Sequence, residues 1–358
     1  MSAADKKWTI GFFIVFLTML LGAGAATAVI DPYFHYHKPL KGLSYPLNNQ
    51  RYQNNGIVKH FDYDAIITGT SMTENFKATE FDRIFQVNSI KIPFSGGSYK
   101  EMNDNLEIAL AHNDGIKIIL RGLDYNSFLS PADSMRYEED FYPWYLYDDN
   151  PFNDVKYVFN KTILFGATKN VISRTRSGLP STTFDEYSNW MANYTFGKEA
   201  VDGTYTRAEK ADGITPISQE DYKNIRENIT QNVTELAAAH PEIEFYLFFT
   251  PYSIYYWDSL NQAGTLKRQL AGEKYAIELM LPYDNIHLFS FFTEHDMICD
   301  LDNYKDIAHY GENINSRILR WMKAGEHELT EENYEAYCEE MKDFYMNYDY
   351  DRLFESCG

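Results

Sequence analysis

The feature that most restricts the fold of this chain is a run of 23 residues without any charge, from Trp8 to Ile30. As an α-helix the run would be about 34 Å long, and the hydrocarbon core of a bilayer is about 30 Å thick. A stretch of this length and composition predicts one membrane-crossing helix within residues 1–30. The rest of the chain must then fold separately, on the water-exposed side of that helix.

The flanks of this run predict its orientation. Lys6 and Lys7 precede it, and basic residues tend to stay on the cytoplasmic side, so we expect the N-terminus inside and the main domain extracytoplasmic. A cleaved signal peptide is the alternative, with an apolar core over 10–21 and A-x-A cleavage sites at 23–25 or 26–28. We prefer an uncleaved single-pass anchor in the cell membrane, and both interpretations export the rest of the chain.

Charge and cysteine usage exclude several classes of protein. The chain carries 32 basic and 52 acidic residues, a net charge of −20, which argues against nucleic acid as a partner. The three cysteines, Cys299, Cys338 and Cys357, show no C-x-x-C spacing, although the last two could pair. His35 and His37 could share one face of an extended segment, but no third ligand lies nearby. We expect neither a metal site nor a cofactor.

Beyond residue 60, short apolar runs alternate with longer amphipathic ones. Such alternation predicts a mostly parallel sheet covered by helices on both faces, an α/β fold of the flavodoxin-like three-layer type. The expected strands are 65–67, 87–94, 116–120, 243–250 and 286–292, and the expected helices are 98–112, 219–239, 258–281 and 312–323.

Composition divides the exported part further. Residues 31–60 contain three prolines and little periodicity, and we interpret them as a linker or leading extension. The α/β domain would cover 61–325, with an irregular insertion at 130–216 that is rich in Tyr, Asn, Asp and Pro and folds over the core. Residues 326–358 form an acidic C-terminal tail. It could be an interaction tail, but a solvated helical face is the commoner explanation of such a stretch.

Ser71 is the first candidate catalytic residue, because it follows directly on the first strand. Working groups in a parallel sheet gather beyond the carboxyl ends of the strands. At the start of the next helix, the Ser71 hydroxyl could act as a nucleophile and its backbone N–H could stabilise an oxyanion. A helix N-cap explains a serine at this position equally well.

A nucleophilic hydroxyl needs a base, and two D-x-x-H strings offer a histidine beside a carboxylate. The first places His287 at the beginning of the last strand, which is the amino end of the sheet. The second, from Asp306 to His309, follows that strand and precedes the last helix. Position therefore favours His309 as the base and Asp306 as the carboxylate that orients the imidazole. About one such string is expected by chance, so the string alone has little weight.

Further donors would have to complete an oxyanion hole. A glycine turn follows the second strand, and the backbone N–H of Gly96 is the natural candidate, although a plain strand-to-helix turn would look the same. Asn126 follows the third strand and could donate its side-chain amide. Asp124 lies close by, and the sequence does not rank the two.

Taken in order, these motifs resemble the SGNH/GDSL hydrolase superfamily. The phrases 67–72 (ITGTSM) and 302–310 (DNYKDIAHY) carry most of the likeness, which is closest to a membrane-anchored bacterial branch. That branch is similar to the D-alanyl transfer proteins of teichoic acid modification and to alginate-type O-acetylation proteins. The resemblance implies Ser71 as nucleophile, Asp306 and His309 as the other triad members, and Gly96 as an oxyanion donor. The family's G-D-S reads G-T-S here, and its G-x-N-D block is only approximated by 122–126.

Three functional hypotheses follow. The first is an extracytoplasmic serine acyltransferase or esterase that acts on acyl groups of a polysaccharide or glycopolymer, with a multi-pass membrane acyltransferase as a partner. The second is a non-catalytic envelope protein that uses the same cleft to hold a glycan or assemble with a partner. The third is an acidic scaffold that acts through residues 326–358.

Overall fold

The computed structural model describes residues 2–355, and these divide into two compact units. Residues 2–62 and 137–183 form the first, which we call the helical unit. Residues 63–136 and 184–355 form the second, which we call the sheet unit. Each unit is described by itself.

A six-stranded sheet forms the centre of the sheet unit, in the order β2-β1-β3-β4-β5-β6. The first five strands pair in parallel, and β6 is antiparallel to β5. The order of the first five strands is that of flavodoxin-like folds, so the predicted fold class is confirmed. The strands are β1 (Ala65–Gly69), β2 (Ser89–Pro93), β3 (Ile118–Leu123), β4 (Glu244–Phe249), β5 (Ile286–Ser290) and β6 (Glu328–Leu329).

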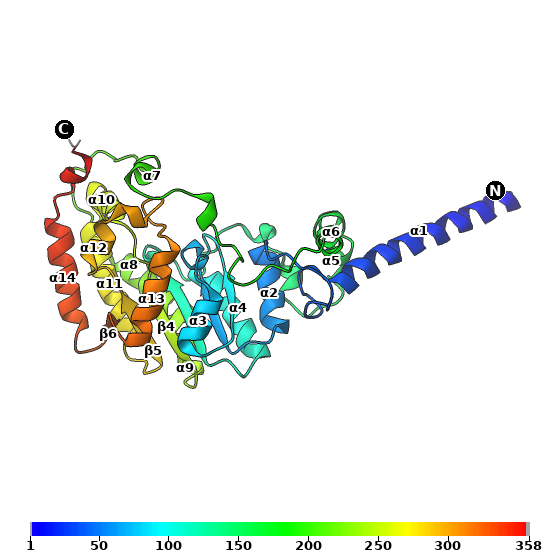
Figure 1. The fold of residues 1–358 in the computed structure, drawn as a ribbon, viewed down its shortest axis with the longest axis horizontal. Coiled ribbons are helices and arrows are strands. Elements are labelled where there is room, and N and C mark those ends of the chain that lie inside the picture. Colours follow the sequence, from blue (N-terminus) through cyan, green and yellow to red (C-terminus); the bar gives the residue numbers. More distant parts are fainter. Residues whose placement is uncertain (1, 356–358) are drawn as a thin grey trace. The chain divides into compact units, whose positions relative to one another are not determined.

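Helices cover the sheet because its strands are apolar on both faces. All five residues of β1 and all five of β2 are buried, as is typical of strands enclosed in a parallel sheet. Helices α3 and α13 pack against each other, as Figure 1 shows, and α8 packs against α11. The longer helices are α3 (Ala78–Phe85), α4 (Tyr99–His112), α8 (Gln219–Ile229), α10 (Ile254–Gln262), α11 (Leu266–Met280), α13 (Glu312–Ala324) and α14 (Tyr334–Asn347).

Two expected helices differ in detail from the structure. The helix at 219–239 is continuous, but it contains a π-helical segment, η7 (Thr230–Thr234), between α8 and α9 (Glu235–Ala239). The helix at 258–281 is divided into α10 and α11. Gly264 lies between them with φ +69°, and a Cβ there would lie 2.2 Å from the carbonyl oxygen of Gly213. This close approach of a neighbouring segment requires glycine and ends α10.

The C-terminal residues form an ordered layer of the sheet unit instead of a tail. After β6, helix α14 buries Tyr337, Met341 and Tyr345 against the domain. The Tyr345 ring stacks on Trp257 at a centroid distance of 3.7 Å, and the Tyr337 hydroxyl donates to buried Glu273 at 2.6 Å. The acidic residues of α14 therefore lie on the solvated face of an amphipathic helix, in agreement with the commoner explanation of such a stretch. Cys299 and Cys338 are free thiols, and Cys357 lies outside the described residues.

The helical unit begins with α1 (Ala3–Ile30), which is apolar over most of its 28 residues. By length and composition this helix can cross a membrane. It ends at Asp31, which has the left-handed backbone conformation of a helix C-cap. The further elements of the unit are α2 (Gln50–His60), η3 (Glu139–Phe141), η4 (Trp144–Leu146), α5 (Val155–Val158), η5 (Ile163–Thr168) and α6 (Lys169–Arg176).

Residues 31–60 are therefore not the polar linker that their prolines predicted. Tyr33 packs with Leu146, Tyr157 and Ile163 in a small core that joins this segment to residues 137–183. The predicted insertion at 130–216 is accordingly divided, because 137–183 belongs to the helical unit and 184–216 to the sheet unit. Proline content alone did not reveal the aromatic residues that pair these segments.

Candidate active site

The turn after β1 is built around the small side chain of Thr73. A Cβ on Gly69 would lie 2.5 Å from the Thr73 methyl group, and a Cβ on Gly122 of β3 would lie 2.8 Å from it. Gly69 has φ +149°, which also favours glycine. Both glycines let the turn η1 (Ser71–Thr73) settle between the carboxyl ends of β1 and β3. The chain reverses its direction across the sheet between these strands, which is where α/β folds place their ligands.

Thr70, and not Ser71, caps this turn. The Thr70 hydroxyl accepts a hydrogen bond from the Met72 N–H, although that contact is long at 3.4 Å. The predicted regular helix after Ser71 is only a single three-residue turn, and α3 begins later, at Ala78. The Ser71 hydroxyl is therefore not used as a cap and is available for another partner.

That partner is His309. Ser71 Oγ lies 2.8 Å from His309 Nε2, and His309 Nδ1 lies 2.9 and 2.8 Å from the two carboxylate oxygens of Asp306. A proton on Nδ1 facing Asp306 leaves Nε2 as the acceptor for the Ser71 hydroxyl. The structure thus brings Ser71 together with His309, which lies more than two hundred positions further along the chain, and with Asp306 beside it. All three side chains are half-buried.

Asp306 is held as a carboxylate by several donors. It accepts the backbone N–H groups of Ala308 and His309 at 2.9 and 2.8 Å, and it pairs with Lys305 Nζ at 2.7 Å. Burial by itself would raise the pKa of Asp306, but the hydrogen bonds from His309 and Lys305 outweigh it and hold that pKa well below its usual range. A fixed negative charge at this position stabilises a protonated His309.

Trp190 covers the serine–histidine pair. Its indole N–H donates to the Ser71 carbonyl at 3.2 Å, and its ring meets the His309 ring edge-on at 5.7 Å. Lys305 lies over the rings of Trp190 and Tyr194 at 5.1 and 4.3 Å. These aromatic contacts help to hold the cation that pairs with Asp306.

A second carboxyl group, Asp124, lies at the end of β3. The Thr70 hydroxyl donates to Asp124 Oδ1 at 2.7 Å. Burial raises the pKa of Asp124 to about 6, and the Thr70 hydrogen bond and the charge of His309 only partly oppose this shift. The site therefore contains one carboxyl group whose pKa is depressed and one whose pKa is elevated.

The two further predicted oxyanion donors lie outside this hydrogen-bonded cluster. Gly96 adopts φ +59° in the turn after β2, where a Cβ would lie 3.3 Å from the Arg136 side chain. Asn126 is exposed, and its amide oxygen accepts from the Ser127 hydroxyl at 3.3 Å. Their roles as oxyanion donors stay predictions.

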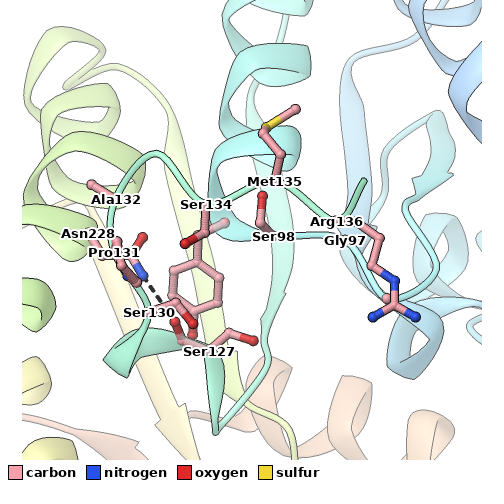
Figure 2. A pocket seen from close by; sticks show the side chains of 12 residues that line it. Gly97, Ser98, Ser127, Ser130, Pro131, Ala132, Ser134, Met135, Arg136 and Asn228 are labelled. Atoms are coloured by element: carbon pink, nitrogen blue, oxygen red, sulfur yellow. Dashed lines mark hydrogen bonds between the residues drawn. The ribbon is translucent and has the colours of Figure 1, made fainter. Parts of the chain in front are cut away.

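A polar cavity of about 200 Å³ adjoins the glycine turn. Figure 2 shows its lining, in which the segment after β3 faces the beginning of α4 and the Asn228 amide donates to the Ser127 carbonyl at 3.0 Å. Four serines contribute to the wall: Ser98, Ser127, Ser130 and Ser134. Hydroxyl groups can both donate and accept, so this lining suits a ligand that is itself rich in hydroxyl groups.

The other D-x-x-H string takes no part in the site. His287 is the second residue of β5, at the amino end of the sheet as predicted, and its ring nitrogens lie 2.7 Å from Glu328 and 2.8 Å from Glu244. The other histidine pair is structural as well, since His35 Nε2 contacts Asp154 at 3.0 Å and His37 Nδ1 contacts the Lys38 carbonyl. Within residues 2–355 no group of three or more potential metal ligands is found.

Three contributors to the site were not identified from the sequence: Thr70, Trp190 and Lys305. Lys305 stands next to the D-x-x-H string and Thr70 next to the serine, so adjacency could have indicated both. Asp124 was considered only beside Asn126. Trp190 comes from the irregular region, where no local pattern marks a residue that will cover a distant histidine.

Comparisons with known proteins add little to this picture. No family model and no curated protein matches the chain. A solved structure described as "a putative platelet activating factor from Streptococcus pneumonia" is similar over 76% of this chain and 88% of its own, at 11% identity and a TM-score of 0.37. The assignment of the site therefore depends on the geometry of this chain alone.

Proposed function

We propose that the protein is a serine acyltransferase or esterase of the SGNH type. The observation that carries the proposal is the 2.8 Å contact between Ser71 Oγ and His309 Nε2, with Asp306 on the opposite ring nitrogen. A hydroxyl, an imidazole and a carboxylate in this sequence of contacts form an activated nucleophile. The ordered motifs that resemble the SGNH superfamily point the same way.

In the proposed reaction Ser71 Oγ attacks the carbonyl carbon of an ester while His309 takes the hydroxyl proton. The tetrahedral intermediate collapses, the alcohol leaves with the proton from His309, and the acyl group stays on Ser71. His309 then accepts a proton from the attacking sugar hydroxyl or water, and Ser71 is regenerated with its proton. Asp306 stabilises the imidazolium at both stages, and the Ser71 N–H is the proposed oxyanion donor.

The proposed substrate is an acylated cell-envelope or secreted polysaccharide. Helix α1 is long and apolar enough to hold the protein at a membrane, and Lys6 and Lys7 favour an extracytoplasmic main domain. The serine-lined cavity beside the glycine turn suits sugar hydroxyls. A multi-pass membrane acyltransferase is the proposed source of the acyl group.

Labelling with a fluorophosphonate tests the nucleophile directly. The wild-type chain should form a covalent adduct on Ser71, identified by peptide mass spectrometry, and Ser71→Ala should form none. As a matched control, Ser95→Ala changes a nearby serine of the glycine turn and should label normally. A wild type that stays unlabelled while it still supports polysaccharide acylation in cells would reject the proposal.

A non-catalytic glycan-binding or assembly protein is the second candidate. It is favoured by Asp124, a carboxyl group that accepts a hydrogen bond from Thr70 next to Ser71, and by the exposure of Asn126, the side-chain amide that was expected to donate to an oxyanion. This candidate predicts that Ser71→Ala and His309→Ala preserve function in cells. The acyltransfer proposal predicts that both variants lose it.

A further inference from the structure

The chain is strongly acidic, but all the charged residues in one segment of the helical unit are basic. The whole chain has 32 basic and 52 acidic residues, whereas segment 155–183 contains no Asp or Glu. Among the described residues no carboxylate forms an ion pair with its basic side chains, most of which are exposed. They are Lys156, Lys161, Lys169, Arg174 and Arg176.

The same segment exposes large apolar side chains. Phe165 is 71% exposed and Val155 is 55% exposed, and Phe152 just before the segment is 90% exposed. Residues of this kind normally lie inside a water-soluble domain or against a partner. Here they occur among lysines and arginines on short helices, a combination that suits the interface of a bilayer.

The segment packs directly against α1 near its C-terminal end. Helix α5 and the π-helical η5 both contact α1, and a Cβ on Gly24 would lie 2.9 Å from the ring of Phe159. Gly24 precedes the end of α1 at Ile30 by six residues, a rise of about 9 Å along the helix. Figure 1 shows α5 beside this end of α1. The segment thus lies at the level where a membrane-crossing α1 would leave the hydrocarbon.

Buried hydrogen bonds fix the segment in that position. The Tyr157 hydroxyl of α5 donates to Asp31 Oδ1 at 2.6 Å, and Asp31 is the C-cap of α1. Asp31 also accepts the backbone N–H groups of residues 35–37, and His35 contacts Asp154 at 3.0 Å. The basic and apolar side chains therefore keep a defined orientation with respect to the axis of α1.

We propose that segment 155–183 is a membrane-contact surface that rests on the bilayer around the C-terminal end of α1 and binds anionic lipid headgroups. Its lysines and arginines face the headgroup phosphates, and Phe165 and its apolar neighbours enter the interfacial layer. Four of the basic residues, Lys156, Lys161, Lys169 and Arg176, are exposed, and together their charges give a salt-dependent attachment to an anionic membrane surface. The inference rests on the proposal that α1 crosses the membrane, and it is independent of the reaction at Ser71.

The test uses the full chain in lipid nanodiscs of phosphatidylcholine alone and in nanodiscs that also contain phosphatidylglycerol. Lysine acetylation is followed by peptide mass spectrometry, with exposed Lys210 of the sheet unit as the internal control. With phosphatidylglycerol, Lys161 and Lys169 should react about 3-fold or more slowly, and added salt should reverse this protection. Equal rates in the two kinds of nanodisc would overturn the proposal.

A charge-reversal variant, K161E/K169E/R176E, supplies the second arm, and K210E is its matched control. The triple variant should lose the lipid-dependent protection of Lys156 while its unfolding temperature stays unchanged.

Protection that occurs only in native membranes, and not in either nanodisc, would identify a protein occupant and contradict the lipid assignment. Failure of the wild-type chain to stay in nanodiscs at all would instead reject the membrane-crossing role of α1. If the variant does not fold, the salt dependence of the wild type still decides.

Discussion

The two D-x-x-H strings of this chain have the same spacing and entirely different surroundings. Asp306 and His309 follow β5 at the carboxyl edge of the sheet, where the imidazole joins a carboxylate to Ser71. His287 lies within β5 at the amino edge and is held between Glu244 and Glu328, while its ring stacks on Tyr246 at 4.7 Å. The direction of the strand, and not the string, decides which histidine can meet a nucleophile.

The difference also separates the proposed chemical role of His309 from the structural role of His287. His309 contacts a group that can react, whereas His287 contacts two glutamates that can only hold it. A histidine between two carboxylates is stabilised in its charged form. Burial by itself would lower the pKa of His287, but the hydrogen bonds that its ring donates to Glu328 and Glu244 outweigh burial and raise that pKa.

Replacing the two histidines in turn should give the largest contrast. His309→Gln removes the proposed base, and the rate of fluorophosphonate labelling at Ser71 should fall by about 10³-fold or more. His287→Gln should label within about 2-fold of the wild type, because His287 lies at the opposite edge of the sheet. Equal losses of labelling rate in both variants would contradict a functional difference between the two strings.

Replacing the aspartates of the two strings, Asp306 and Asp284, should give a similar but smaller contrast in the rate of fluorophosphonate labelling. Asp306→Asn keeps the shape but removes the charge that orients and stabilises His309, and labelling should slow by about 10²- to 10³-fold. Asp284→Asn, the corresponding change in the other string, should leave the rate unchanged. Rates are compared at one pH, with circular dichroism to confirm that both variants are folded. A normal rate in Asp306→Asn would exclude a triad.

Asp124 provides a test of electrostatics near His309. The pKa of Asp124 is about 6 in the folded state, above the ordinary value of 3.8. At pH values between 3.8 and about 6, the folded protein therefore binds more protons than the unfolded chain does. Stability contributed by this group therefore falls as the pH rises from about 4 to 6. Asp124→Asn should be more stable than the wild type by about 1–3 kcal/mol at pH 8, and the difference should disappear near pH 4.

Denaturant unfolding of Asp124→Asn and the wild type at several pH values measures this effect. Thr70→Val is a useful companion, because it removes the hydroxyl that donates to Asp124 and should shift the pKa of Asp124 further upward. A constant stability difference from pH 4 to 8 would contradict the elevated pKa of Asp124.

His287 should give the smallest effect, with a defined pH dependence. Its folded-state pKa is raised above 6.5, so its ion pairs stabilise the protein fully below that value, and the contribution is lost as the pH rises through the folded-state pKa. His287→Gln should lower the free energy of unfolding by about 0.5–1 kcal/mol at pH 5.5 and by less at pH 9, because the site is partly solvent-exposed. A larger loss of unfolding free energy at pH 9 than at pH 5.5 would contradict the raised pKa of His287.

Several features of the protein followed from local sequence. The apolar run of α1, the buried strands and the alternation of strands with helices determine the fold class, because burial and periodicity are properties of neighbouring residues. Strand polarity then placed Ser71 and His309 at one edge and His287 at the other. The predicted identities and spacing of Ser71, Asp306 and His309 agree with the geometry of the site.

Tertiary structure decided the remainder, because it depends on contacts between residues far apart in the chain. The proline-rich segment after α1 belongs to a core because the Tyr157 hydroxyl donates to Asp31. The acidic C-terminal residues belong to a layer of the sheet unit because Tyr345 stacks on Trp257. Likewise, Trp190 covers Ser71 across more than a hundred positions. A local pattern encodes which face of an element is apolar, but not which distant side chain will be packed against it.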